Sequence, residues 1–186
     1  MADLSLDTRR AVAAVVRRDG GLVLAVLRPD EPGEELPGIW GLPATTLGDG
    51  ESPEDGLRRL GREKLGVALT PLGTLAEGEQ QRTDYILHMT VHEASLEGEP
   101  RLPARTSDAQ TGDRPVASVT LYEALDWLPS SAFREASERG SLCCRLLLTP
   151  TPPVAPCSST SACLRRRLSG RGWRRSCDRL RRRTSL

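Results

Sequence analysis

The sequence predicts an α/β domain, because apolar strand-like runs alternate with segments that carry helix-start and helix-stop residues. Two apolar runs flank an Asp-Gly-Gly turn near the beginning of the chain, which is typical of a β-hairpin. A capped helix and further strand-like segments follow. We therefore expect strands and helices packed together in one domain.

The predicted hairpin joins Ala11–Arg17 to Leu22–Leu27. Both runs are apolar along most of their length, which indicates a hairpin that is buried on at least one face. Asp19, Gly20 and Gly21 supply the turn between them. A loop rich in Pro and Gly follows the second strand.

The clearest helix of the chain is predicted over residues 52–65. Ser52 is placed to cap the open N–H groups, and Pro53 suits the first helical position. Gly66 ends the helix, as a left-handed terminal glycine commonly does. Gly61 lies inside the helix, where it costs up to about 1 kcal/mol relative to Ala and therefore indicates close packing.

Later segments predict three strands and two short helices. The strands are expected at Gly73–Glu77, Tyr85–His92 and Ser118–Tyr122, and the helices at Ser131–Arg139 and Ser141–Leu148.

Charge divides the chain in two. Residues 1–148 contain 16 Lys and Arg against 24 Asp and Glu, whereas residues 149–186 contain 10 Arg against one acid, Asp178. The second part is rich in Pro, Ser and Arg and has no hydrophobic periodicity. We expect residues 9–148 to form the domain and residues 149–186 to form a disordered tail.

Composition also argues against several classes of function. The chain has no apolar run near 18 residues, so no membrane span is expected. Its five cysteines form no CxxC pair and lie far from both histidines, which argues against a zinc site. An odd number of cysteines without a signal peptide favours the cytoplasm. The Arg-rich tail would attract nucleic-acid phosphates but matches no recognition module, so nucleic acid is not an expected partner.

The segment from Trp40 to Val67 resembles the Nudix box, whose pattern is G, five residues, E, seven residues, R, E, an aliphatic, any residue, E, E, any residue, G, aliphatic. The positions that match are Glu51, Arg59, Glu63, Gly66 and Val67. The positions that depart are Thr45 at the first Gly, Leu60 at the Glu after Arg, Gly61 at the aliphatic and Lys64 at the second Glu of the pair.

This resemblance implies an α/β/α sandwich with a mixed sheet, and hydrolysis of nucleoside diphosphate derivatives as small-molecule substrates. In that family the box carboxylates hold Mg²⁺ or Mn²⁺ against the diphosphate. The resemblance makes Glu63 the surviving metal ligand and the one candidate for catalysis, and Glu51 a second metal ligand. It gives Arg59 and Gly66 structural roles in the box.

Helix periodicity indicates how the departures from the box pattern affect metal binding. Residues at i, i+3 and i+4 share a face, so positions 60, 63 and 64 are predicted to face one cleft. There, Leu, Glu and Lys carry no net charge, where three glutamates would carry three negative charges. We therefore expect weakened metal binding and weakened hydrolysis.

Alternatives remain open for the function and for single residues. The protein as a whole is either a weakened hydrolase or a non-catalytic module that binds a nucleotide or a protein partner. Lys64 is either a solvated surface lysine or a substrate-binding residue that contacts phosphate. Leu60 fits a core residue, and Arg59 with Glu63 fits either an exposed helix pair or an inward-facing one.

Overall fold

The computed structural model describes residues 6–103 and 121–149. In chain order its elements are β1 (Asp7–Val15), β2 (Arg17–Arg18), β3 (Leu22–Leu27), β4 (Trp40–Gly41), β5 (Ala44–Thr46), α1 (Pro53–Leu60), a π-helical turn (Gly61–Leu65), β6 (Ala68–Gln81), β7 (Tyr85–Glu97), β8 (Ala124–Pro129), a 3₁₀ turn (Ser130–Phe133), α2 (Arg134–Glu138) and α3 (Leu142–Leu148). The predicted strand at Ser118–Tyr122 falls mostly outside the described residues, and so does the predicted tail, 149–186, apart from Thr149.

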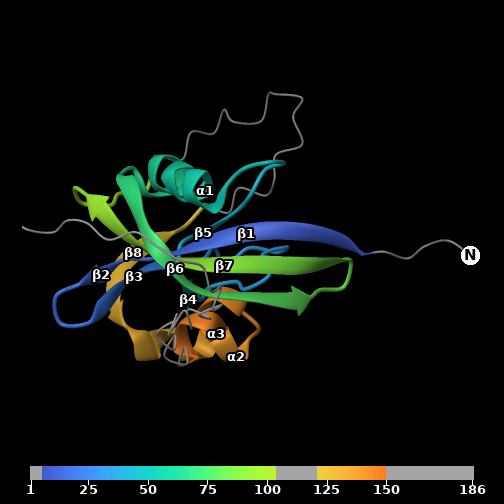
Figure 1. Ribbon diagram of the computed structural model, residues 1–186. Helices are drawn as coiled ribbons and strands as arrows, with labels where there is room; N and C mark the ends of the chain where they lie inside the picture. Colours follow the sequence, from blue (N-terminus) through green and yellow to red (C-terminus); the bar gives the residue numbers. More distant parts are fainter. Residues whose placement is uncertain (1–5, 104–120, 150–186) are drawn as a thin grey trace, which may run out of the picture. The chain divides into compact units, whose positions relative to one another are not determined.

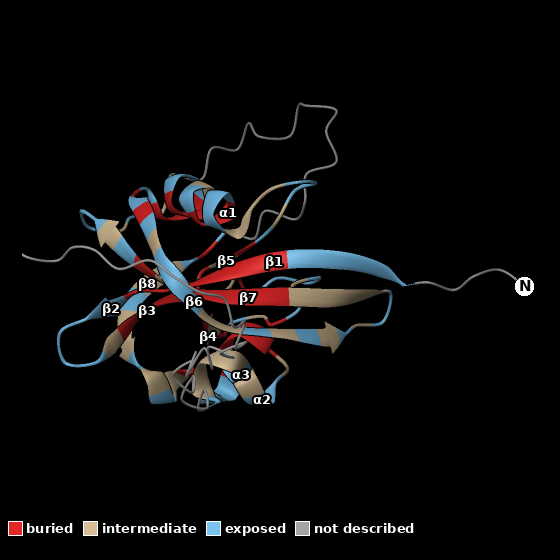
Figure 2. Ribbon diagram, viewed as in Figure 1, coloured by how far each residue is buried: buried red, intermediate tan, exposed pale blue. Residues whose placement is uncertain are grey.

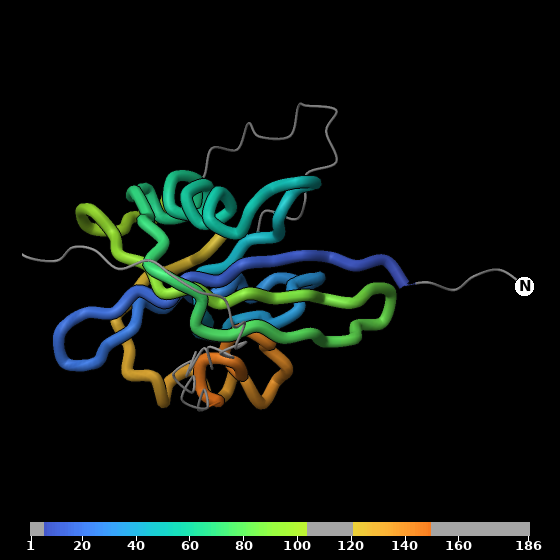
Figure 3. Tube along the Cα trace, viewed as in Figure 1, coloured from blue at the N-terminus to red at the C-terminus, as the bar shows by residue number. Residues whose placement is uncertain are grey.

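The strands form two four-stranded sheets. The first has the order β5-β1-β7-β6, with β1 parallel to β7 and the other neighbours antiparallel. Figure 3 shows β1 and β7 running side by side along this sheet. In the second sheet, β3 pairs antiparallel with β2, β4 and β8. The predicted α/β fold class with a mixed sheet is confirmed.

Alternation along β1 divides the core into two apolar clusters. Ala11, Ala13 and Val15 belong to one cluster, whereas Val12 and Ala14 belong to the other. Successive side chains of a strand point to opposite faces, so a strand covered on both faces must be apolar at every position. Figure 2 shows that β1 is exposed over its first half and buried over its second half, whereas β7 is most buried at its centre.

Helices cover both faces of the first sheet, as the α/β/α prediction requires. Leu57 and Leu60 of α1 pack into the cluster of Val12, whereas Leu142 and Cys143 of α3 pack into the opposite one. Figure 1 shows α1 on one side of the strands and α2 with α3 on the other. Among the described residues, no helix has the length and apolar character needed to cross a bilayer.

The predicted hairpin is only partly right. Its turn is present, with Gly20 and Gly21 at φ of 83° and 76°, but β1 does not pair with β3. Of the residues before the turn, only Arg17 and Arg18 of β2 pair with β3, and the Leu24 N–H also donates to the carbonyl of Val16. Because β1 is apolar on both faces, its pattern shows burial without showing which strand it pairs with.

Candidate functional site

The box helix begins where the sequence predicts. The Ser52 hydroxyl oxygen accepts a hydrogen bond of 3.1 Å from the Asp55 N–H, and Pro53 is the first helical residue. This cap satisfies one of the open donors of the first turn. The prediction that helical structure extends to Leu65 is also confirmed, although its last five residues form the π-turn, Gly61–Leu65.

Two glycines explain how the π-turn fits between α1 and β6. A Cβ on Gly61 would lie 2.7 Å from the Val67 carbonyl oxygen and 2.9 Å from Leu69 Cγ, so the backbone approach needs glycine. Gly66 ends the turn in the left-handed region, at φ 61°, and its N–H bonds to the carbonyl of Gly61. The close packing expected at Gly61 and the terminal role expected for Gly66 are both present.

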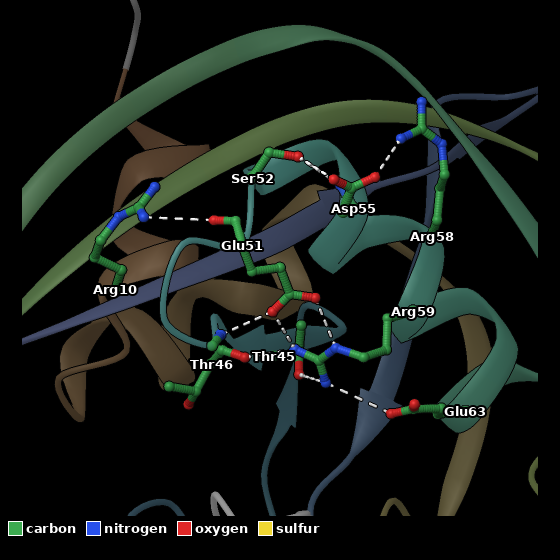
Figure 4. Close-up of polar contacts among 10 residues, drawn as sticks. Arg10, Thr45, Thr46, Glu51, Ser52, Asp55, Arg58, Arg59 and Glu63 are labelled. Carbon is green, nitrogen blue, oxygen red and sulfur yellow. Dashed lines mark hydrogen bonds and ion pairs between the residues drawn. The ribbon is translucent and has the colours of Figure 1, made fainter.

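Arg59 and Glu51 form a two-pronged ion pair (Figure 4). Arg59 donates from Nε to Glu51 Oε1 at 2.8 Å and from Nη2 to Glu51 Oε2 at 2.9 Å. Arg59 Nη2 also donates to the Thr46 carbonyl at 2.7 Å, and Glu51 Oε2 accepts from the Gly48 N–H at 2.8 Å. The hydrogen bonds from Arg59 hold the pKa of Glu51 below its ordinary value. The Glu51 carboxylate thus has protein donors on both oxygens.

Glu63 lies at the margin of this cluster. Its Oε2 is 3.5 Å from Arg59 Nη1, and 53% of its side chain is exposed. An exposed contact of this length contributes little stability. Of the two alternatives for Arg59 and Glu63, the structure supports an exposed helix pair, while Arg59 itself faces Glu51.

Leu60 does not face a cleft, so the predicted common face of positions 60, 63 and 64 is wrong. Its side chain is fully buried in the cluster that contains Val12 and Leu24. The π-turn begins directly after Leu60, and its i to i+5 bonding adds a residue to the turn. Glu63 and Lys64 therefore do not follow Leu60 at α-helical spacing. The interpretation of Leu60 as a core residue is confirmed.

Lys64 is buried, which corrects the interpretation of it as a solvated surface lysine. Only 7% of the residue is exposed. Its Nζ donates to the Ala44 carbonyl oxygen at 3.1 Å and lies 5.3 Å from the centre of the Tyr122 ring. Burial, together with the nearby cations Arg28 and Arg59, lowers the pKa of Lys64 to about 8. The box helix thus directs an ammonium group inward, where the family pattern has a carboxylate.

This ammonium lines a cavity of about 280 Å³. The polar side chains that line the cavity include Arg28, Glu34, Glu35, Arg82, Tyr85 and Tyr122. Glu51, Leu60 and Glu63 are not among its lining residues. Of the residues singled out from the sequence as candidate ligand contacts, only Lys64 faces the cavity.

The two arginines of the cavity are paired with its own acids. Arg28 Nη1 donates to Glu34 Oε1 at 2.6 Å, and Arg82 Nη2 lies 3.5 Å from Glu35 Oε2. Sequence reasoning missed these residues because they come from loops and strand ends far from the box. The Pro- and Gly-rich loop after β3, which carries both acids, was the available signal.

The Tyr122 hydroxyl joins Lys64 at the backbone of β5. It accepts from the Ala44 N–H and donates to the Ala44 carbonyl, both at 2.9 Å. Burial raises the pKa of Tyr122 to about 12, so it stays neutral at physiological pH. This tyrosine was predicted as part of a strand and not as part of the site.

The carboxylates of the described residues do not form a cage for a resident divalent cation. Such ions need several oxygen ligands at one point. Within residues 6–103 and 121–149, no group of three His, Cys, Asp or Glu side chains lies close enough together to hold one. Glu51 is engaged by Arg59, and Glu63 is half exposed and contacts Arg59. The assignment of Glu63 and Glu51 as metal ligands therefore gains no support from the structure.

Comparison with known proteins places these features in context. The family model described as the NUDIX domain matches residues 7–137. The solution structure of the E. coli ORF135 protein is similar, with a TM-score of 0.58, 20% identity, and coverage of 81% of this chain and 97% of that one. No curated protein sequence matches the chain.

Two MutT structures are similar as well. The MutT protein from Methanosarcina mazei Go1 has a TM-score of 0.54 and 17% identity, covering 70% of this chain and 83% of that one. The MutT NUDIX hydrolase from Burkholderia pseudomallei has a TM-score of 0.51 and 25% identity, covering 67% and 85%. These likenesses agree with the fold described above.

Proposed function

Because the chain belongs to the NUDIX family, we propose that it binds a nucleoside diphosphate derivative in the cavity beside the π-turn, with metal-dependent hydrolysis strongly weakened. NUDIX hydrolases generally use divalent metal ions, which neutralise phosphate and activate water. The ligand class is the one that the family resemblance implies.

The proposed loss of activity rests on one observation. The turn at which the family pattern places carboxylates presents one exposed acid and one buried ammonium. Leu60 is in the core, Glu63 is half exposed, and Lys64 points into the cavity. At about 5 Å and an effective dielectric near 20, a unit charge pair is worth roughly 3 kcal/mol. Exchanging a carboxylate for an ammonium near a divalent cation therefore costs several kcal/mol, which corresponds to orders of magnitude in metal affinity.

The cavity supports ligand binding independently of turnover. Its volume of about 280 Å³ is close to the lower end of small-molecule sites, which start near 300 Å³. Cationic, acidic and tyrosine side chains line it together with apolar residues such as Leu36 and Met89. Cationic side chains beside apolar residues suit a small molecule that has both an anionic and an apolar part.

Binding and turnover are separated by testing the full chain against a panel of nucleoside diphosphate derivatives with Mg²⁺ or Mn²⁺. We expect at least one nucleotide to raise the melting temperature by several degrees, because a ligand at about 100 times its Kd adds about 2.7 kcal/mol of stability. We expect release of nucleoside monophosphate, followed by chromatography, to be very slow. Efficient metal-dependent turnover, or no stabilisation by any nucleotide, would contradict the proposal.

Glu63→Gln is the matched control for any residual turnover. The substitution removes the one acid that the box turn retains, and its side chain is exposed, so the fold should tolerate it. If slow hydrolysis persists unchanged in this variant, the hydrolysis does not depend on a metal ion held by Glu63. Nucleotide-induced stabilisation should be the same in the variant and in the natural chain.

A further inference from the structure

We propose that Lys64 is the phosphate-binding residue of the cavity and that its ammonium replaces the divalent cation, so that the chain binds diphosphate groups without metal. This inference rests on the proposed function, since it assigns the contact that holds the anionic part of the ligand. Its chemistry is that of a fixed cation with free hydrogen-bond donors.

The Lys64 ammonium has more hydrogen-bond donors than its protein contacts use. A lysine ammonium carries three donors and no acceptor. The hydrogen bond to the Ala44 carbonyl uses one donor, and that carbonyl also accepts from Tyr122. The centre of the Tyr122 ring lies 5.3 Å from Nζ, so the ring covers one side of the ammonium. Because Lys64 lines the cavity, its remaining donors have room to meet a ligand there.

Charge pairing distinguishes Lys64 from the arginines of the same cavity. Arg28 and Arg82 each form an ion pair with an acid that also lines it. By contrast, no carboxylate of the described residues forms an ion pair with Lys64. A buried charge without a counter-ion is costly, and an anion from solution relieves that cost. The cavity thus combines two arginines in direct ion pairs with one lysine that makes no direct ion pair with a carboxylate of the described residues, although Glu34 and Glu63 act on it weakly.

The neighbouring arginines make the electrostatic potential at Lys64 more positive. Arg28 and Arg59 both disfavour the charged form of Lys64 and so raise the positive potential at its Nζ, whereas Glu34 and Glu63 act more weakly in the opposite direction. A diphosphate group carries negative charge, which the positive potential at Lys64 attracts. Arg59 remains held by Glu51, so only Lys64 is free to change its partner.

The test uses inorganic pyrophosphate as the probe and the full chain as the protein. Calorimetric titrations are run in EDTA and in Mg²⁺, on the natural chain and on Lys64→Met, Lys64→Arg and Arg62→Met. Arg62→Met is the matched control, because it removes one positive charge from an exposed position of the same π-turn, outside the cavity lining. We expect pyrophosphate to bind in EDTA, with at least about tenfold loss in Lys64→Met and little change in Arg62→Met.

The possible failures are distinguishable. Nucleotide and pyrophosphate binding that requires Mg²⁺, or that survives unchanged in Lys64→Met, would overturn this inference and leave the proposed function standing. If neither pyrophosphate nor any nucleotide binds under either condition, the proposed function fails with it. Lys64→Arg should keep part of the affinity, because it preserves the charge and changes the shape. Circular dichroism confirms that each variant is folded.

Discussion

Lys64 donates a 3.1 Å hydrogen bond to the carbonyl oxygen of Ala44, linking the π-turn to β5 at the wall of the cavity. The contact places a cation in the interior of a domain whose family normally concentrates carboxylates near this helix. Both the expected loss of metal chemistry and the proposed gain of a metal-free anion site follow from this pair. Each is open to measurement.

Replacing Lys64 by Met should stabilise the protein at neutral pH. The pKa of Lys64 falls from 10.5 to about 8 in the folded chain, so the unfolded chain binds the proton more tightly. A shift of that size corresponds to roughly 3 kcal/mol against the folded state below pH 8. Allowing for the lost bond to Ala44, we expect Lys64→Met to add about 1–3 kcal/mol in urea unfolding at pH 7.

The pH dependence of that difference provides its check. Below pH 8 both states of the natural chain carry the charged lysine and the penalty is complete. As pH rises from about 8 to 10.5, the folded state loses its proton first, and the gain from Lys64→Met should shrink. A variant that is less stable than the natural chain at every pH would show that the buried ammonium is not a cost.

Pyrophosphate binding should weaken as pH rises above about 8, because the neutral amine no longer attracts an anion. The charged and titratable groups that act on Lys64 are Arg28, Arg59, Glu34, Glu63 and Tyr122. Arg28 and Arg59 have pKa values raised above the ordinary value and stay charged between pH 7 and 9.5, and burial keeps Tyr122 neutral there. Lys64→Arg should remove the pH dependence, since arginine stays charged and the titration of pyrophosphate itself affects both proteins equally. Equal pH profiles in the two proteins would show that a group other than Lys64 causes the pH dependence of binding.

Leu60→Glu should unfold or strongly destabilise the domain rather than create a metal site. Leu60 is fully buried among apolar side chains, so a glutamate there places an unpaired carboxyl in the core. We expect a loss of about 3–5 kcal/mol in chemical unfolding, whereas the control Leu60→Met should lose less than about 1.5 kcal/mol. A stable Leu60→Glu protein that binds Mn²⁺ tightly would restore the common helix face that the sequence predicts.

Arg59 and Glu51 should be strongly coupled in stability. Their two hydrogen bonds of 2.8 and 2.9 Å join partly buried groups, and bonds to charged groups contribute about 1.5–3 kcal/mol. A double-mutant cycle with Arg59→Met and Glu51→Gln should therefore give a coupling free energy of about 1–3 kcal/mol. Additive effects of the two substitutions would mean that the pair is not formed in solution.

Acid should weaken the same pair. The pKa of Glu51 lies below its ordinary value in the folded chain, so its contribution is complete above that ordinary value. The contribution is lost as pH falls through the lowered pKa. The stability difference between the natural chain and Glu51→Gln should shrink correspondingly in the acid range.

Local sequence was enough to predict the box helix, whereas partners distant in sequence were not predictable. Ser52, Gly61 and Gly66 could be placed because capping and close approach depend on neighbouring residues. The partner of β1 could not be identified, since a strand that is apolar on both faces fits several neighbours.

The candidate site likewise depends on contacts that the local sequence does not reveal. Helical periodicity put Leu60 and Lys64 on one face, but the π-turn between them, closed by the packing of Gly61 against β6, changed where each side chain points. The burial of Lys64 depends on Ala44 and Tyr122, which lie 20 and 58 residues away in the chain. No pattern within the box itself contains that information.

Nuclear magnetic resonance of the lysine side chain tests the central claim most directly. Lys64 is the only lysine of the chain, so ¹³C-labelled lysine gives one ε-methylene signal that needs no assignment. In EDTA, added pyrophosphate should shift this signal in a saturable manner and move its titration midpoint upward from about 8. A signal that titrates near the ordinary value of 10.5, or that ignores pyrophosphate while the ligand binds, would contradict the account.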